Sequence, residues 1–181
     1  MENKTIRIAL IGPESSGKST IAAHIAARFD FVLISENARQ YLGALNRPYA
    51  LSDVLHIYEQ QMAFESEQLL GLPKGLVSDT ECINGLVWCE EAFGSAPSWF
   101  ENQILSKPYD LYLLTTPDIP YEADPLRENP GRGMYFFDRY QKELEKRGLP
   151  FIVISGDGET RLRLVEKTIQ ELIFNGRLQR S

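Results

Sequence analysis

The sequence predicts one α/β domain of three layers, in which helices cover both faces of a five-stranded parallel sheet. Two observations predict this fold. Five short runs of β-branched, aliphatic and aromatic residues recur along the chain of 181 residues, and a turn or a polar residue closes each run. Longer segments of helical character separate the runs. Strands that alternate with helices are joined by right-handed crossovers, which make the sheet parallel.

The five runs lack the alternation of apolar and polar residues that marks a half-exposed strand, so each is expected to be buried on both faces. We expect strands at 6–11, 31–34, 75–78, 111–114 and 151–154. Glu36, Asp79 and Asp118 follow three of these runs within a few residues. Ligands of open α/β sheets bind at the carboxyl ends of the strands, so these acids are candidates for a site.

The segments between the strands are expected to be helical, because good helix formers dominate them or apolar residues recur every three to four positions. The expected helices cover 19–29, 52–70, 82–93, about 98–105, 135–147 and a last segment from 157 or 158 to just before Gly176. Ser52 is expected to cap the second helix, and Gly176 to end the last one.

Length and composition favour one globular domain over residues 1–181. The chain has 19 basic and 25 acidic residues, and the net charge of −6 disfavours a nucleic-acid binder. No apolar run approaches the roughly 18 residues of a membrane span, and the first residues lack the apolar core of a signal peptide. Cys82 and Cys89 are interpreted as buried thiols, so a cytoplasmic protein is expected. The sequence does not indicate an oligomeric state.

A phosphate-binding loop follows the first expected strand. Residues 12–19, Gly-Pro-Glu-Ser-Ser-Gly-Lys-Ser, fit the pattern G-x-x-x-x-G-K-[ST] in full. Its glycines let backbone N–H groups surround a phosphate, Lys18 reaches the β and γ oxygens, and the Ser19 hydroxyl can bind Mg²⁺. The motif predicts ATP and Mg²⁺ as cofactors. The predicted nucleotide-binding residues of the loop are Gly12, Glu14, Ser15, Ser16, Gly17, Lys18, Ser19 and Thr20.

Further patterns narrow the class of P-loop protein. An N-K-x-D guanine-binding tetrad is missing from the sequence, and residues 79–82 do not form the D-x-x-G motif of a GTPase. The chain is also short for an oligomeric ATPase motor. A compact P-loop kinase fold that acts on a small molecule is favoured. Glu14 is unusual beside phosphates: it either holds a water of Mg²⁺ or points outward.

Phosphoryl transfer needs one carboxylate to orient or deprotonate the acceptor hydroxyl and another to hold Mg²⁺ or its waters. We assign Glu36 to the acceptor and Asp79 to Mg²⁺, with the reverse assignment left open, and both could contact the substrate. For Asp118 an ordinary strand-end or capping role is favoured. Arg39, three residues after Glu36, either clamps the acceptor side or forms a plain surface ion pair.

The segment 117–133 is rich in Pro, Gly and Arg, which favours an active-site lid over a regular element. Arginines that close over a transferring phosphoryl group lower the barrier electrostatically. Arg127 is the favoured catalytic arginine, and Arg132 is the second candidate, on the nucleotide side. A solvated loop whose arginines pair with neighbouring acids is the alternative.

With these motifs the chain resembles the ribosylnicotinamide kinase domain of the NadR-type NAD-biosynthesis proteins. The resemblance covers nearly the whole chain, and residues 12–19, Ser-Glu-Asn-Ala-Arg at 35–39, Ser-Asp-Thr at 78–80 and Asp-Pro-Leu-Arg-Glu-Asn-Pro at 124–130 carry it. It implies ATP-dependent phosphorylation of the ribose 5′-hydroxyl of nicotinamide riboside, giving NMN. Nicotinamide riboside is a cation, so Trp88, or a tyrosine such as Tyr41, could stack on its pyridinium ring, although Trp88 is equally typical of a core residue.

Two departures limit what the resemblance implies. His24 and His56 lie far apart in expected helices, so the H-x-x-H motif of an adenylyltransferase is missing and a kinase alone is expected. Asn37 stands where many relatives are expected to carry an aromatic residue. A P-loop kinase of another nucleoside or small hydroxyl compound remains an alternative, as does an ATP-binding regulatory module without turnover.

Overall fold

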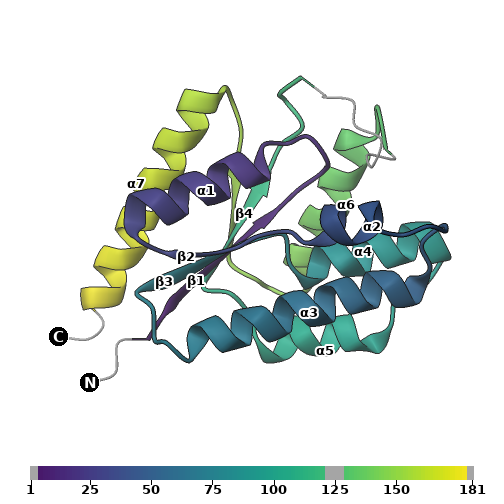
Figure 1. Ribbon diagram of the computed structural model, residues 1–181. Helices are drawn as coiled ribbons and strands as arrows, with labels where there is room; N and C mark the ends of the chain where they lie inside the picture. Colours follow the sequence, from purple (N-terminus) through teal and green to yellow (C-terminus); the bar gives the residue numbers. More distant parts are fainter. Residues whose placement is uncertain (1–3, 121–128, 179–181) are drawn as a thin grey trace.

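The computed structural model describes residues 4–120 and 129–178, with side chains up to Phe174. Strands and helices alternate along most of this part of the chain (Figure 1). In chain order the elements are β1 (Ile6–Ile11), α1 (Lys18–Phe29), β2 (Val32–Ile34), α2 (Ala38–Gly43), α3 (Leu51–Leu69), β3 (Gly75–Asp79), α4 (Cys82–Phe93), α5 (Ser98–Ser106), β4 (Leu111–Thr115), α6 (Gly133–Lys146), β5 (Phe151–Ile154) and α7 (Gly158–Leu178).

Within the described residues, five parallel strands form one sheet in the order β2-β3-β1-β4-β5. This confirms the predicted fold class. β1 lies at the centre, with Ile8 opposite Val77 of β3 on one side and Leu111 of β4 on the other. The chain leaves β1 toward β2 and later returns to its other side as β4, so the connections diverge at the carboxyl end of β1. In parallel α/β sheets this divergence creates the crevice in which ligands bind.

Helices cover both faces of the sheet, as Figure 1 shows. One face packs against α3, α4, α5 and α6 through residues such as Ala9, Leu76 and Tyr112. The other face packs against α1 and α7 through Ile8 and Val77. Side chains of a strand alternate between faces, so the uninterrupted apolar runs supply both cores at once. None of the helices in the described part of the chain combines the length and apolar character that a membrane crossing requires.

The structure corrects several expected boundaries. α2 was not expected, because six residues carry too little periodicity to be recognised. The start of α3 is stabilised by Asp53 and not by Ser52: the Asp53 carboxylate accepts a hydrogen bond of 2.7 Å from the Ala50 N–H. α7 continues past Gly176 to Leu178. Cys82 and Cys89 are buried free thiols, as expected.

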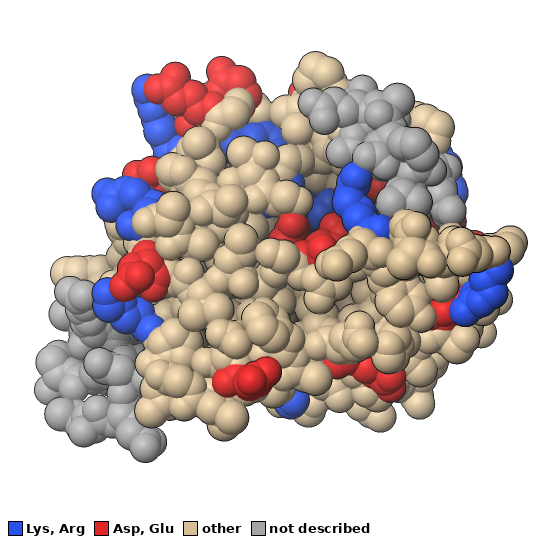
Figure 2. Space-filling model, in the orientation of Figure 1, with Lys and Arg blue, Asp and Glu red and all other residues tan. Residues whose placement is uncertain are grey.

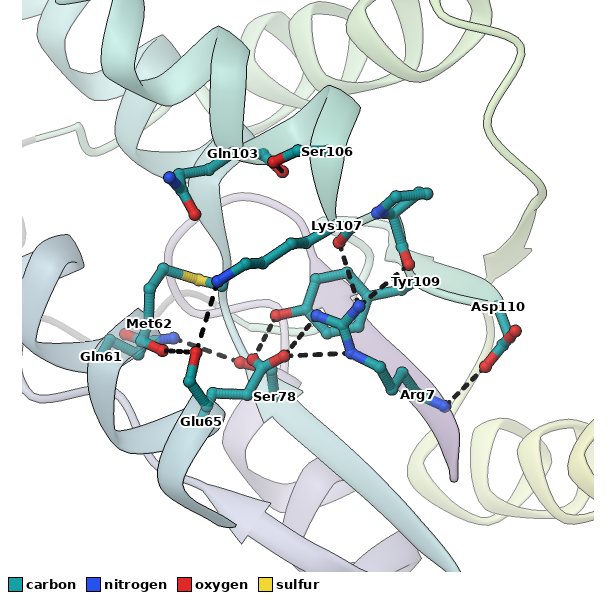
Figure 3. Close-up of polar contacts among 12 residues, drawn as sticks. Arg7, Gln61, Met62, Glu65, Ser78, Gln103, Ser106, Lys107, Tyr109 and Asp110 are labelled. Atoms are coloured by element: carbon teal, nitrogen blue, oxygen red, sulfur yellow. Dashed lines mark hydrogen bonds and ion pairs between the residues drawn. The ribbon is translucent and has the colours of Figure 1, made fainter. Parts of the chain in front are cut away.

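A buried polar network joins α3 to the sheet (Figure 3). Arg7 of β1 pairs with Glu65 of α3, and its Nε lies 3.2 Å from Glu65 Oε1. The Tyr109 hydroxyl donates to Glu65 Oε2 at 2.5 Å, and the Arg7 guanidinium lies 4.5 Å from the centre of the Tyr109 ring. A buried charge is tolerated only when it is paired and hydrogen-bonded, so these contacts satisfy Glu65 and hold α3 in register with β1.

Candidate active site

Backbone conformation shapes the loop between β1 and α1. Gly12 and Gly17 have φ of 151° and 81°, and Ser15 also has a positive φ of 57°. A Cβ at Gly12 would lie 2.1 Å from Thr115 Oγ1, so only glycine fits against the end of β4. The Ser16 hydroxyl lies 2.6 Å from the Thr115 hydroxyl and donates to the Pro13 carbonyl at 2.7 Å. These contacts hold the loop against the sheet.

Lys18 lies across this loop. Its Nζ donates to the carbonyls of Gly12 and Pro13 at 2.9 and 2.7 Å. Gly17 is the N-cap of α1 and, as a glycine, has no side chain to cap the helix. The first N–H groups of α1 and the positive end of its dipole therefore face the loop, an arrangement suited to a phosphate group.

A cavity of about 680 Å³ opens beside the loop. In Figure 2, acidic and basic side chains meet in a hollow in the upper half of the face in view. All the predicted nucleotide-binding residues of the loop line the cavity, namely Gly12, Glu14, Ser15, Ser16, Gly17, Lys18, Ser19 and Thr20. The predicted residues Glu36, Arg39, Trp88 and Arg132 line it as well. The structure thus brings the phosphate loop and the expected acceptor side to one space.

Glu36 follows β2 and faces other charged groups across this cavity. Burial raises the pKa of its carboxyl above the ordinary value, and the negative charges of Asp79 and Glu14 add to this rise. Lys18 and Arg39 oppose it. Glu36 therefore lies within electrostatic reach of the loop lysine and of the second predicted carboxylate, and its affinity for a proton is increased.

Asp79 ends β3 and is 5% exposed. It does not line the cavity, whereas its neighbour Thr80 does. Its Oδ1 has no hydrogen-bond partner within the described part of the chain. A buried carboxylate oxygen without a partner is costly, so this position suits a ligand such as a metal-bound water.

These residues fit a magnesium ion carried by a nucleotide. Among residues 4–120 and 129–178, no three His, Cys, Asp or Glu side chains gather closely enough to hold a metal ion. Mg²⁺ in phosphate sites typically takes one or two protein ligands and keeps several waters. Ser19 on the cavity wall, and Asp79 with an Oδ1 that has no hydrogen-bond partner among the described residues, are the groups that would hold the ion or its waters.

The lid segment is only partly described. Arg127 lies outside the described residues. Arg132 donates to Glu91 Oε2 at 2.8 Å and to Asn129 Oδ1 at 3.2 Å, and its guanidinium lies 4.5 Å from the centre of the Tyr135 ring. Arg132 is thus held against the end of α4 while it lines the cavity.

Glu14 joins the phosphate loop to the end of the lid segment. Its Oε2 accepts a hydrogen bond of 3.2 Å from the Asn129 N–H. The sequence left open whether Glu14 holds a water of Mg²⁺ or points outward. The contact with Asn129 is a third arrangement that ties two distant segments together at the rim of the cavity.

Arg161 is a residue that the sequence analysis missed. It is 3% exposed and donates to the carbonyls of Ser16 at 2.7 Å and Gly156 at 2.8 Å. It also pairs with Asp118, whose second oxygen accepts from the Gly156 N–H at 2.7 Å. Asp118 therefore has the structural role that was favoured for it, and Arg161 joins the phosphate loop to the ends of β4 and β5. A pair 43 residues apart leaves no local signal in the sequence.

We expect Asp118→Asn to lower the free energy of unfolding by about 1 kcal/mol, since it weakens a partly exposed charge pair while keeping the side-chain shape. Denaturant melts at neutral pH measure the change. Glu159→Gln, which breaks the exposed pair between Glu159 and Arg163 on α7, is the control and should change the stability by less than about 0.5 kcal/mol. Equal effects of the two variants would contradict a special role of the Asp118–Arg161 pair.

The far wall of the cavity is aromatic. Trp88 of α4 donates from Nε1 to the Tyr49 hydroxyl at 3.2 Å, and the two ring centres lie 5.4 Å apart. Both residues line the cavity. Tyr41 does not line it: its hydroxyl donates instead to Asp53 Oδ1 at 3.0 Å. Tyr41, which was considered as an alternative to Trp88, is thus not part of this wall, whereas Tyr49 is.

A parallel sheet with a glycine-lined phosphate loop after its first strand defines a P-loop nucleotide-binding protein. The family model described as "AAA domain" matches residues 7–161. The chain belongs to this family. A search of the curated proteins finds no relative that matches this chain.

Several solved structures share the fold. A NadR protein in complex with NR matches with a TM-score of 0.80 and 20% identity, over 93% of this chain and 51% of that one. A NadR protein in complex with NAD and AMP-PNP matches with a TM-score of 0.75 and 19% identity, over 93% and 49%. A deoxyadenosine kinase from M. mycoides matches with a TM-score of 0.64 and 13% identity, over 92% and 100%. This chain spans about half the length of the NadR chains.

Proposed function

We propose that this protein is a kinase that transfers the γ-phosphoryl group of ATP to the ribose 5′-hydroxyl of nicotinamide riboside and so forms NMN. One observation is the main support for the proposal: a single cavity is lined by the phosphate loop, by Glu36 and by the aromatic pair of Trp88 and Tyr49. Burial raises the pKa of the Glu36 carboxyl. The solved NadR structures with NR (nicotinamide riboside) and with NAD and AMP-PNP support both ligands of this reaction.

In the proposed reaction the phosphate loop binds the triphosphate through its N–H groups and Lys18. Ser19 and Asp79 would hold Mg²⁺ or its waters, and the ion would neutralise charge on the β and γ oxygens. Glu36 accepts the proton of the acceptor hydroxyl while the oxygen of that hydroxyl forms a bond to the γ-phosphorus. The bond from that phosphorus to the bridging oxygen breaks, and ADP leaves with the electron pair.

The aromatic wall fits the base of this acceptor. A pyridinium cation is attracted to the faces of Trp and Tyr rings, and Trp88 and Tyr49 both line the cavity. Glu91 of α4 also lines the cavity, but its carboxylate is paired with Arg132 and Arg139, so the attraction for a cation comes from the aromatic faces. The wall therefore favours a cationic nucleoside over a neutral one of the same size.

We expect Trp88→Leu to raise KM for nicotinamide riboside about tenfold, because it removes the aromatic face while keeping an apolar side chain. KM for ATP should stay the same. Trp99→Leu on α5, which lies outside the cavity lining, is the matched control. An equal loss with a neutral nucleoside acceptor would contradict recognition of the positive charge.

ADP release in the presence of Mg-ATP tests the function, with nicotinamide riboside, nicotinic acid riboside, common nucleosides or no acceptor added. Release that depends on nicotinamide riboside, with NMN identified by its mass, is the expected result. Faster turnover of another nucleoside would instead identify a kinase of that nucleoside. The match to the deoxyadenosine kinase, which covers the whole length of that chain, supports this second candidate. ATP binding without turnover of any acceptor would support a regulatory module instead.

A further inference from the structure

Thr80, between β3 and α4, has an unusual backbone conformation. Its φ is +72°, and the non-glycine residues with positive φ in the described part of the chain are Ser15, Asp30, Leu72 and Thr80. A β-branched residue avoids this region because its Cβ substituents crowd the backbone. Such strain persists only where the surrounding structure imposes it, and it is most frequent at functional sites.

Two elements hold Thr80 in this conformation. Its N–H donates to the Leu10 carbonyl of β1 at 3.2 Å. Its carbonyl accepts from Gln61 Nε2 at 3.0 Å and from the Ser78 hydroxyl at 2.8 Å. Gln61 lies on α3, is 1% exposed and also contacts Ser78, as Figure 3 shows. The strained turn is therefore fixed from the sheet on one side and from α3 on the other.

The Thr80 hydroxyl is buried, and no group in the described part of the chain pairs with it. The residue is 4% exposed and lines the cavity. Thr80 Oγ1, like Asp79 Oδ1, has no hydrogen-bond partner among the described residues. A buried hydroxyl normally bonds to some group, so an unpaired one on a cavity wall indicates a ligand atom.

Thr80 also lies at one end of a row of cavity residues. Asn84, Trp88 and Glu91 of α4 line the same cavity. The spacing of three or four residues places them on one face of the helix. The row begins at Thr80, directly after β3, which pairs with β1 and so ends beside the phosphate loop. It ends at the aromatic wall that is proposed to bind the pyridinium ring. An acceptor that lies along α4 therefore has its reacting end at Thr80.

We propose that the Thr80 hydroxyl hydrogen-bonds the reacting hydroxyl of the acceptor, and that Gln61 is the positioning residue that keeps Thr80 strained for this contact. The inference rests on the proposed function in requiring a nucleoside-like acceptor. It adds two residues to the site, one from the strand end and one from the interior of α3. The strained backbone and the buried hydroxyl without a partner thus belong to the same cavity-lining residue.

Protein stability tests the strain without any ligand. At ordinary positions glycine is less stabilising than alanine, whereas at positive φ the order reverses. Thr80→Gly should therefore melt at a higher temperature than Thr80→Ala. Leu72, also at positive φ but exposed and outside the cavity lining, is the control site, and Leu72→Gly should likewise melt above Leu72→Ala. A lower melting temperature for Thr80→Gly than for Thr80→Ala would show that the backbone at Thr80 is not strained.

Steady-state kinetics test the contact. Thr80→Ala and Thr80→Gly should each lower kcat/KM for the acceptor about tenfold or more, since a hydrogen bond to the reacting group is lost. Thr80→Ser, which keeps the hydroxyl, should retain most of the activity. The affinity for ATP and the dependence of the rate on Mg²⁺ concentration should not change. Full activity of Thr80→Ala, or an altered Mg²⁺ dependence with an unchanged acceptor KM, would overturn the contact.

A double-mutant cycle tests Gln61. Gln61→Met removes the amide that holds the Thr80 carbonyl, so it should lower kcat/KM in the wild-type background and have no further effect in Thr80→Ala. Equal losses in both backgrounds would mean that Gln61 acts on packing alone. A wild-type protein that turns over no acceptor would overturn the proposed function and the acceptor contact with it. The melting temperatures of Thr80→Gly and Thr80→Ala would still show whether the backbone at Thr80 is strained.

Discussion

Lys18→Ala is expected to lower the rate of phosphoryl transfer by about 10³-fold or more while the fold stays intact. The Lys18 ammonium lies against the phosphate loop, where it bonds to the carbonyls of Gly12 and Pro13. Its charge therefore lies where negative charge develops on the transferred phosphoryl group. The rate of ADP release at saturating acceptor measures the loss.

Lys74→Ala is the matched control for removal of a lysine. Lys74 forms an exposed pair with Asp30 at 2.7 Å, far from the cavity lining, so this variant should keep full activity. Circular dichroism of Lys18→Ala should overlay that of the wild-type protein, since its two bonds to the loop are local. Retention of activity by Lys18→Ala would contradict the assignment of residues 12–19 as the phosphate loop.

The features that the sequence predicted are those set by neighbours along the chain. The strands were recognisable because both faces of the sheet are buried and each run is uninterrupted. The phosphate loop was recognisable because its glycines, lysine and serine lie within eight residues and act together. Elements such as α2 escaped because six residues do not complete two helical turns.

The features that the sequence could not predict depend on contacts between distant segments. Glu14 and Asn129 are 115 residues apart and meet only because the fold brings the phosphate loop and the segment before α6 together. The strain at Thr80 has no signal in the residue type, because threonine is a poor residue for a positive φ. Sequence reasoning favours residues with expected chemistry and so overlooks those that acquire a role through their position.

Glu36→Gln is expected to lower kcat by about 10²-fold or more, with little change in the affinity for ATP. Glutamine keeps the shape and the polarity of the side chain but cannot accept the proton of the acceptor hydroxyl. Glu36 lines the cavity between the phosphate loop and α2, and burial raises the pKa of its carboxyl. A base with an increased affinity for protons takes up the acceptor proton more readily. Single-turnover rates with ATP already bound separate this step from binding.

The pH dependence gives the assignment a second test. Only the ionised form of Glu36 can accept a proton, so kcat/KM should fall as the pH drops through the pKa of this carboxyl. Because that pKa is raised, the fall should begin above the ordinary titration range of a glutamate, which lies near 4.3. The residual activity of Glu36→Gln should lack this acidic limb. Glu59→Gln, at an exposed position of α3 outside the cavity lining, should keep the wild-type profile.

Comparison with Asp79→Asn decides between the two carboxylates. If Asp79 holds Mg²⁺ or its waters, Asp79→Asn should raise the Mg²⁺ concentration required for half-maximal rate and retain the acidic limb that belongs to Glu36. Glu36→Gln should show the opposite pair of effects, a normal Mg²⁺ requirement and no acidic limb. The reverse pattern would make Asp79 the base. Asp79 Oδ1 is buried and has no hydrogen-bond partner among the described residues, and this favours the metal-side role.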